Sequence, residues 1–286
     1  MVQHGIPSPP STDPALFPPV RKWVPQHQSW PYAPKDFLRL DETDDGDFYN
    51  QPRYVAHIDE QAIERLTKYF GTVLPRNGSV LDFCTSWHSW YPDAYVEAVK
   101  SNELEVYGIG MSRPELDRNS LFKNHPARSF VADLNETPDV RAHLSKGGAE
   151  PPQLRAATCT VSIDYLVKPV EVLRSLRECT VEGAKVHLVI SNRCFPTKAV
   201  RIWLELDTEE RLQLVGNYLH FAGWKDIEII DLCARDEEGK RLTDENGRML
   251  QGQGMLGFLR LRHMDPLWVV RGTKERNAES RCDAVN

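Results

Sequence analysis

From Ser79 onward, short apolar runs alternate with stretches of helical periodicity, and this alternation constrains the fold more than any other feature. Amphipathic segments such as "PVEVLRSLREC" separate the apolar runs. Strands that are joined through helices form right-handed crossovers, which build a mostly parallel sheet with helices on both faces. We expect five such strands, at Val80–Phe83, Leu104–Ile109, Ser129–Ala132, Ala157–Ser162 and Val186–Ser191.

Two later runs, "DIEIIDLC" and "PLWVVRG", have no helical pattern between them. They predict an antiparallel pair at one edge of the sheet, which brings the expected sheet to seven strands. A helix is expected to begin after Asp59, a good N-cap residue. A second one, "TEERLQLVGNYLHFAGW", is expected to end near Gly223, because glycine favours the backbone conformation that closes a helix.

The ends of the chain differ in composition from its middle. Nine of the 20 prolines lie before residue 35, which excludes helix and inner strand there. We expect 1–47 to be an extended arm laid over the domain, or a recognition sequence for a partner. Its acidic run "DETDDGD" is expected to be a solvated loop. Residues 48–272 would form the domain, with an exposed hairpin-like insertion or gating flap at 235–254, and 273–286 a flexible tail.

Composition excludes several functions. A formal charge of −6 argues against a nucleic-acid backbone as partner, since such surfaces need clustered Lys and Arg. No apolar run approaches the roughly 20 residues of a membrane helix, and no secretory signal is visible. The six cysteines are scattered without metal-binding spacing, so we expect reduced thiols, no metal and a cytoplasmic location.

Ligands in an open α/β sheet bind at the carboxyl ends of the strands. The first three strands are followed by "DFCTSWHSW", "GIGMSRPEL" and "ADLNETP". The fourth and fifth are followed by "SIDYLVKP" and "SNRCFPTKAVRIW". Polar and aromatic side chains are common in all five segments, and we expect the site there.

This series resembles the class I S-adenosylmethionine-dependent methyltransferases over roughly Phe48 to Gly272. "SVLDFCTS" stands where the family has an Asp-x-Gly-x-Gly loop, and "VADLN" matches the segment whose Asp meets the adenine ring. More narrowly, the chain is similar to a little-characterised subgroup with "FY-x-x-PR-x-V-x-HID", "GMS" or "GMN", and "SNRCFPTKAV". The resemblance implies a Rossmann-like fold, S-adenosylmethionine as cofactor, and methyl transfer to a small-molecule acceptor.

The resemblance also implies roles for residues at the strand ends. Asp82 would order the loop or reach the amino group of the cofactor, although a strand-end cap is its simpler role. Asp133 would accept from the adenine amine, with Leu134 packed near the base. Met111 would lie against the ring or belong to the core. The expected cofactor contacts are completed by Tyr49, Cys84, Ser86, Gly110 and Ser162.

Two departures from the family pattern bear on the cofactor. Cys84 and Ser86 occupy glycine positions, where a Cβ costs little only if φ is negative. Gly110 stands where most members have an acidic residue that holds the ribose hydroxyls. Ser112 or a neighbouring carboxylate would have to replace that acceptor.

A general base is needed only when the acceptor must lose a proton, so the catalytic candidates are few. They are His57, Asp164 and Tyr165. Helix capping or packing is the simpler role of His57. The expected substrate contacts are Tyr54, His88, Asn192 and Arg193, with packing the alternative for His88 and an ion pair the alternative for Arg193.

Two rival functions follow from the altered loop. One is a non-catalytic methyltransferase-like protein that binds a partner or serves as a scaffold. The other keeps the cofactor pocket for another reaction, such as a cyclisation. A nicotinamide dehydrogenase is disfavoured, because the Gly-x-Gly-x-x-Gly turn and its distal acidic residue are both absent.

Overall fold

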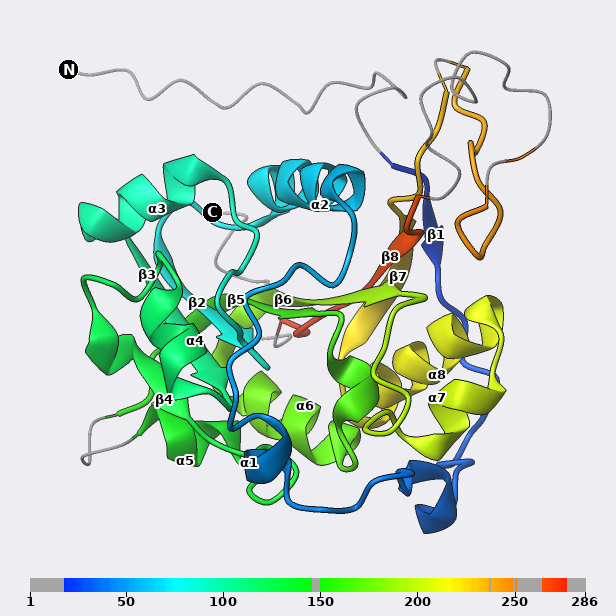
Figure 1. The fold of residues 1–286 in the computed structure, drawn as a ribbon, viewed down its shortest axis with the longest axis horizontal. Helices are drawn as coiled ribbons and strands as arrows, with labels where there is room; N and C mark the ends of the chain where they lie inside the picture. The colour runs from blue at the N-terminus through cyan, green and yellow to red at the C-terminus, as the bar shows by residue number, and fades with distance from the viewer. Residues whose placement is uncertain (1–17, 146–149, 237, 249, 251–263, 277–286) are drawn as a thin grey trace, which may run out of the picture.

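A computed structural model of the chain describes residues 18–145, 150–236, 238–248, 250 and 264–276 (Figure 1). Its strands are β1 (Val20–Lys22), β2 (Gly78–Phe83), β3 (Leu104–Gly110), β4 (Ser129–Val131), β5 (Leu154–Thr160), β6 (Thr180–Ser191), β7 (Lys225–Asp231) and β8 (Leu267–Thr273). All eight form one sheet in the order β1-β7-β8-β6-β5-β2-β3-β4.

The sheet is parallel from β4 to β6 and antiparallel beyond it. Strands β2 to β6 pair in parallel with their neighbours. Strand β8 is antiparallel to both β6 and β7. The predicted fold class, a mostly parallel α/β sheet with a late antiparallel pair, is therefore confirmed. The eighth strand, β1, was not predicted; it comes from the arm and pairs with β7.

Helices cover both faces of the sheet (Figure 1). The α-helices are α1 (Asp45–Phe48), α2 (Glu60–Val73), α3 (Asp93–Lys100), α4 (Arg113–Arg118), α5 (Val140–Leu144), α6 (Pro169–Glu178), α7 (Arg201–Glu205) and α8 (Thr208–Phe221). Short 3-10 turns are η1 (Pro34–Phe37), η2 (Pro126–Arg128) and η3 (Ile163–Tyr165). One core joins α2, α3 and α4 to the sheet, and another joins α5, α6 and α8 to its other face.

The predicted helix boundaries have clear physical causes. The Asp59 side chain accepts a hydrogen bond from the backbone N–H of Ala62 and so caps α2. Apolar residues of α2 at helical spacing, such as Leu66 and Phe70, are fully buried. Gly223 follows α8 with a φ of +90°, which glycine adopts without strain.

The arm follows the surface of the domain before it reaches the strand ends. Trp23 packs on α8, where a Cβ at Gly216 would lie 2.0 Å from its Nε1 atom. Trp30 stacks on Phe37 at a ring-centroid distance of 5.8 Å. From α1 the chain then crosses in front of the sheet to α2 (Figure 1). The arm thus delivers residues 45–59 to the carboxyl edge of the sheet.

The later predicted segments are described only in part. In the insertion at 235–254, the N–H of Asp236 donates to Lys240 and that of Asp244 to Arg248, so each acidic repeat closes a turn. Of the predicted tail, 277–286 lies outside the described residues, and Thr273 ends β8. The division into arm, domain and tail stays a prediction. Within the described ranges no helix is long and apolar enough to cross a membrane, and no group of metal-ligating side chains is assembled.

Candidate functional site

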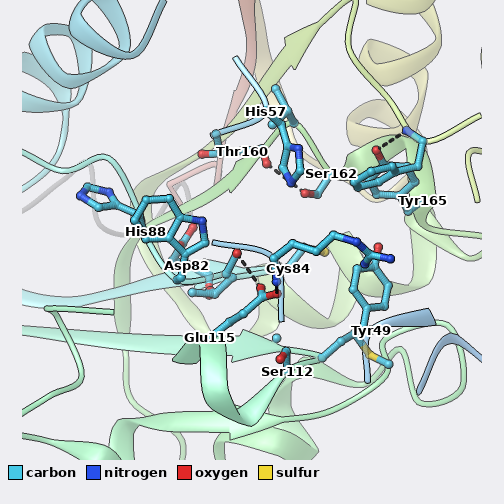
Figure 2. Close-up of a pocket in the computed structure, with 18 of the residues that line it drawn as sticks. Tyr49, His57, Asp82, Cys84, His88, Ser112, Glu115, Thr160, Ser162 and Tyr165 are labelled. Atoms are coloured by element: carbon cyan, nitrogen blue, oxygen red, sulfur yellow. Dashed lines mark hydrogen bonds between the residues drawn. The ribbon is translucent and has the colours of Figure 1, made fainter. Parts of the chain in front are cut away.

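A cavity of about 590 Å³ opens at the carboxyl ends of the central strands (Figure 2). The strand order reverses between β2 and β5, because β3 and β4 lie on one side of β2 while β5 and β6 lie on the other. Small-molecule sites have volumes of roughly 300–1,000 Å³ and favour such switch points. The predicted residues that line this cavity are Tyr49, His57, Asp82, Cys84, Ser86, His88, Gly110, Met111, Asp133, Leu134, Ser162, Tyr165 and Arg193.

The loop after β2 lies directly against the end of β3. The N–H of Thr85 donates to the carbonyl of Ile109 at 2.8 Å. A Cβ at Gly110 would lie 2.1 Å from the Thr85 carbonyl oxygen. This position therefore cannot carry the acidic side chain that the family pattern has there. The close approach of the two backbones explains the glycine.

Cys84 has a positive φ of +55°, so the condition that would make its Cβ inexpensive is not met. A left-handed conformation costs a non-glycine residue roughly 1–2 kcal/mol. Trp90 and Val161, at +57° and +44°, also line the cavity. Three of the five such residues in the described ranges thus surround one cavity, as strained residues do at functional sites.

The strain at Cys84 can be tested with two substitutions. Alanine usually gives a more stable protein than glycine, and at a position with positive φ this order of stability is reversed. We expect Cys84→Gly to be more stable than Cys84→Ala by about 1 kcal/mol, because only alanine keeps the Cβ at positive φ. Urea unfolding of the two variants measures the difference. Cys179, with φ of −83°, is the matched control, and alanine should be the more stable substitution there. The same order at both positions would contradict a strained Cys84.

Asp82 is buried at the end of β2 and belongs to a polar network. Its Oδ1 accepts from the Thr158 hydroxyl at 2.8 Å, and that hydroxyl is 2.6 Å from the Tyr91 hydroxyl. Burial raises the pKa of Asp82 to about 6, against hydrogen bonds from Ser89 and Thr158. The Asp82 side chain is thus held by neighbouring hydroxyl groups, and it also lines the cavity.

The β3–β4 end of the cavity holds the residues expected around a nucleoside. Met111 and Leu134 are apolar lining residues there, and Leu134 is buried. The Asp133 carboxylate accepts from the backbone N–H of Asn135 at 2.7 Å, and burial raises the pKa of Asp133. This end combines apolar surface with an acceptor, which suits a purine ring.

Glu115 is a lining residue that was not singled out from the sequence. It is buried in the first turn of α4. Its Oε2 accepts from the Ser86 hydroxyl and its Oε1 from the backbone N–H of Arg53, both at 2.7 Å. Figure 2 shows Glu115 between Cys84 and Ser112. The Glu115 carboxylate therefore lies near Gly110, the position at which the family pattern has an acidic residue and this chain has none.

The β5–β6 end of the cavity is aromatic and carries titratable groups. Tyr165 accepts through its hydroxyl from the backbone N–H of Phe195 at 2.9 Å. Burial raises the pKa of Tyr49 and of Tyr165 far above the ordinary tyrosine value. His57 faces the cavity beside Phe195, and partial burial lowers its pKa. A neutral imidazole is therefore available at pH 7 to accept a proton.

Two predicted substrate contacts line the cavity but are already engaged. The Nδ1 of His88 accepts from the backbone N–H of Trp90, and the two rings stack at 4.2 Å. Arg193 pairs with Asp265 at 2.8 Å, so the ion-pair interpretation of Arg193 is the one the structure supports. Ser162 donates to the Thr160 carbonyl at 2.9 Å. These contacts fix the wall of the cavity.

Three residues that were predicted to belong to the site do not line the cavity: Asp164, Tyr54 and Asn192. Asp164 is 2% exposed within the core, because the 3-10 turn η3 directs it inward while Tyr165 faces the cavity. Tyr54 lies on the surface and contacts the Pro114 carbonyl. Asn192 donates to the carbonyl of Asn246 in the insertion.

Asp164 gives a pH-dependent prediction. Burial raises its pKa to about 7, and its Oδ2 has no hydrogen-bond partner among the described residues. Because the folded pKa lies above the unfolded value, its contribution to stability is present below about pH 4 and lost as pH rises through 7. We expect Asp164→Asn to raise the free energy of unfolding by roughly 2–4 kcal/mol at pH 8 and to change little at pH 4. Urea unfolding at both pH values, with exposed Asp47→Asn as control, measures this; equal effects at both would contradict it.

The acidic run of the arm is not wholly the solvated loop that was predicted. Asp45 is 5% exposed and lines the cavity. It accepts from Arg39 at 2.7 Å and lies 3.2 Å from the Nζ of Lys198, which is fully buried. Asn135 also donates to Asp45, at 3.0 Å. This ion-pair cluster holds α1 against the segment that follows β6.

The fold and the cavity together define a class: a mostly parallel α/β protein with a ligand-sized site at its topological switch point. No family model matches the chain, and no curated protein matches it. The narrower resemblance to a subgroup with "SNRCFPTKAV" stays a prediction.

Solved structures that resemble this chain include several methyltransferases and a [4+2]-cyclase, SpnF. Phosphoethanolamine N-methyltransferase 2 from Haemonchus contortus, bound to S-adenosyl-L-methionine, is 14% identical with a TM-score of 0.43, over 74% of this chain and 52% of that one. A methyltransferase from Archaeoglobus fulgidus is 14% identical (TM-score 0.46; 75% and 94%). Geranyl diphosphate C-methyltransferase from Streptomyces coelicolor A3(2) is 11% identical (TM-score 0.44; 80% and 96%).

This chain spans about half the length of the Haemonchus enzyme. Likeness at these values concerns the fold alone. The function proposed below therefore rests on the cavity's own residues.

Proposed function

We propose that the chain is an S-adenosylmethionine-dependent methyltransferase that acts on a small-molecule acceptor. The observation that carries the proposal is the buried Glu115 carboxylate beside the glycine-restricted end of β3, in a cavity that also holds Asp133. Glu115 would accept from the ribose hydroxyls and Asp133 from the adenine amine. Met111 and Leu134 would pack on the base. Although Cys84 and Ser86 carry side chains, the cavity that they line together with Asp133 keeps a volume of about 590 Å³.

The charge of the cavity suits a cationic ligand. Of the six carboxylates in its lining, Asp45 and Asp265 are paired with cations. The other four form no ion pair within the described ranges: Asp59, Asp82, Glu115 and Asp133. Clefts with an excess of one sign attract the opposite charge. When bound, S-adenosylmethionine supplies an electrophilic methyl group on a sulfonium. The acidic lining would favour that positive charge over a neutral nucleoside.

The chain's own residues would orient the reactants and exclude water. The segment between α1 and α2 crosses in front of the strand ends (Figure 1), and Tyr49 in this segment lines the cavity. His57, neutral at pH 7, would accept a proton from an acceptor that must lose one. Tyr165 would position the segment after β6 through its hydrogen bond with Phe195.

Glu115→Gln tests the nucleoside assignment. We expect it to weaken S-adenosylhomocysteine binding about 10–100-fold, because a charged hydrogen bond contributes roughly 1.5–3 kcal/mol. Calorimetric titration measures the affinity, and a thermal melt checks folding. Glu103→Gln, an exposed carboxylate before β3, is the matched control. Unchanged affinity in Glu115→Gln would refute the role of Glu115, and no binding by the intact protein at millimolar ligand would favour the non-catalytic function.

A further inference from the structure

We infer that the methyl acceptor carries an anionic group, a carboxylate or a phosphate, and that Arg53 binds it. This inference rests on the proposed function and specifies its substrate class. Arg53 lines the cavity on the segment between α1 and α2. It was not among the candidates identified from the sequence.

The structure fixes Arg53 at both ends. Its backbone N–H donates to Glu115 at 2.7 Å. Its guanidinium carbon lies 4.3 Å from the ring centre of Phe48 and 5.4 Å from that of Phe195. Aromatic faces hold a guanidinium in place while leaving its N–H donors at the edge of the plane. The stacking therefore orients the guanidinium N–H groups and leaves them free to donate hydrogen bonds.

The charge of Arg53 is not neutralised within the described ranges. Its guanidinium has no hydrogen bond or ion pair there, whereas Arg193, the other arginine of the cavity, pairs with Asp265. Arg39 nearby pairs with Asp45. An arginine that keeps its five donors available in a cavity matches the planar oxygens of a carboxylate or the oxygens of a phosphate.

The position of Arg53 points to the acceptor and not to the nucleoside. The backbone N–H of Arg53 donates to Glu115, but its guanidinium reaches Phe195 in the segment after β6, whereas Met111 and Asp133 follow β3 and β4. The His57 ring lies 5.0 Å from the same Phe195 ring, and the charge of Arg53 helps to lower the pKa of His57. An anion on Arg53 would therefore hold the rest of its molecule beside the base candidate.

Benzoate, phenyl phosphate and neutral benzamide are suitable probes, because this end of the cavity is aromatic. Each is titrated into the full chain with and without saturating S-adenosylhomocysteine, and ligand-observed NMR measures the affinity. We expect benzoate or phenyl phosphate to bind at least tenfold more tightly than benzamide, and the comparison of the two anions identifies the group.

Variants of the chain test whether Arg53 is the binding residue. Arg53→Met should weaken binding of the preferred anion 10–100-fold, and Arg53→Lys should weaken it less. Arg118→Met is the matched control: Arg118 also stacks on an aromatic ring, that of Tyr54, but does not line the cavity.

The outcomes separate this inference from the proposed function. Anion binding lost in Arg53→Met and kept in Arg118→Met, with S-adenosylhomocysteine affinity unchanged, supports the inference. Equal binding of benzamide and the anions overturns it. So does a loss of S-adenosylhomocysteine affinity in Arg53→Met without loss of anion binding, because Arg53 would then bind the cofactor's own carboxylate. If the intact protein binds no S-adenosylhomocysteine, the proposed function fails, and the titrations without it still test the anion site.

Discussion

Replacing Asp45 with asparagine is expected to lower the free energy of unfolding by about 3–5 kcal/mol, the usual cost of removing one partner from a buried ion pair. Although burial opposes it, hydrogen bonds from Arg39 and Asn135 hold the pKa of Asp45 below its ordinary value. Asparagine keeps the shape but leaves Arg39 and the fully buried Lys198 without this charge. Urea unfolding at pH 7 measures the loss.

Asp47→Asn is the matched control, because Asp47 lies two residues away and is exposed. It should change the unfolding free energy by less than about 0.5 kcal/mol. The stability that a carboxylate with a lowered pKa provides is lost as pH falls through that pKa, so the effect of Asp45→Asn should shrink below about pH 4. If both variants unfold alike at pH 7, Asp45 does not anchor the arm.

Gly110→Ala is expected to disrupt the site strongly. The added Cβ would lie 2.1 Å from the Thr85 carbonyl oxygen, and a backbone atom can move only with its loop. Forced repacking costs about 1–3 kcal/mol of stability. Displacing the loop by about 1 Å should weaken S-adenosylhomocysteine binding on the order of 100-fold, as misplacement of this size does to catalysis. Calorimetry and a thermal melt measure the two effects.

Gly71→Ala, within α2, provides the comparison for a methyl group that meets one side chain and no backbone atom. Its Cβ would meet only the Pro92 ring, at 3.2 Å, and alanine favours helix. We expect near-native stability and affinity for this variant. A Gly110→Ala protein that binds as tightly as Gly71→Ala would show that the loop does not need to approach β3 so closely.

The alternating pattern predicted the fold well because the central strands β2, β3 and β5 are largely buried between two helical layers. β2 and β3 differ from their predicted ranges by two residues or fewer at each end. β6 begins six residues earlier than expected, at Thr180, since its first residues include the exposed Glu182 and the half-buried Lys185, which interrupt the apolar run. β1 escaped prediction because three residues among prolines carry no periodic signal, and only pairing with β7 makes them a strand.

The residues that line the cavity could be predicted where they lie directly at or after the end of a strand. Asp82 and Asp133 are placed at the ends of β2 and β4 by the strands themselves. Arg53 was missed because it reaches the cavity from the irregular segment between α1 and α2, and Glu115 because it reaches the cavity from the first turn of α4. The prediction for Asp164 was wrong because the 3-10 turn η3 directs Asp164 and Tyr165 to different sides. No sequence pattern indicates which of these two side chains faces the cavity.

A crystal structure of the protein soaked with S-adenosylhomocysteine tests the central claim most directly. We predict adenine density between Met111, Leu134 and Asp133, with both ribose hydroxyls within hydrogen-bond distance of the Glu115 carboxylate. A nucleoside bound elsewhere, or no density in this cavity at millimolar ligand, would contradict it.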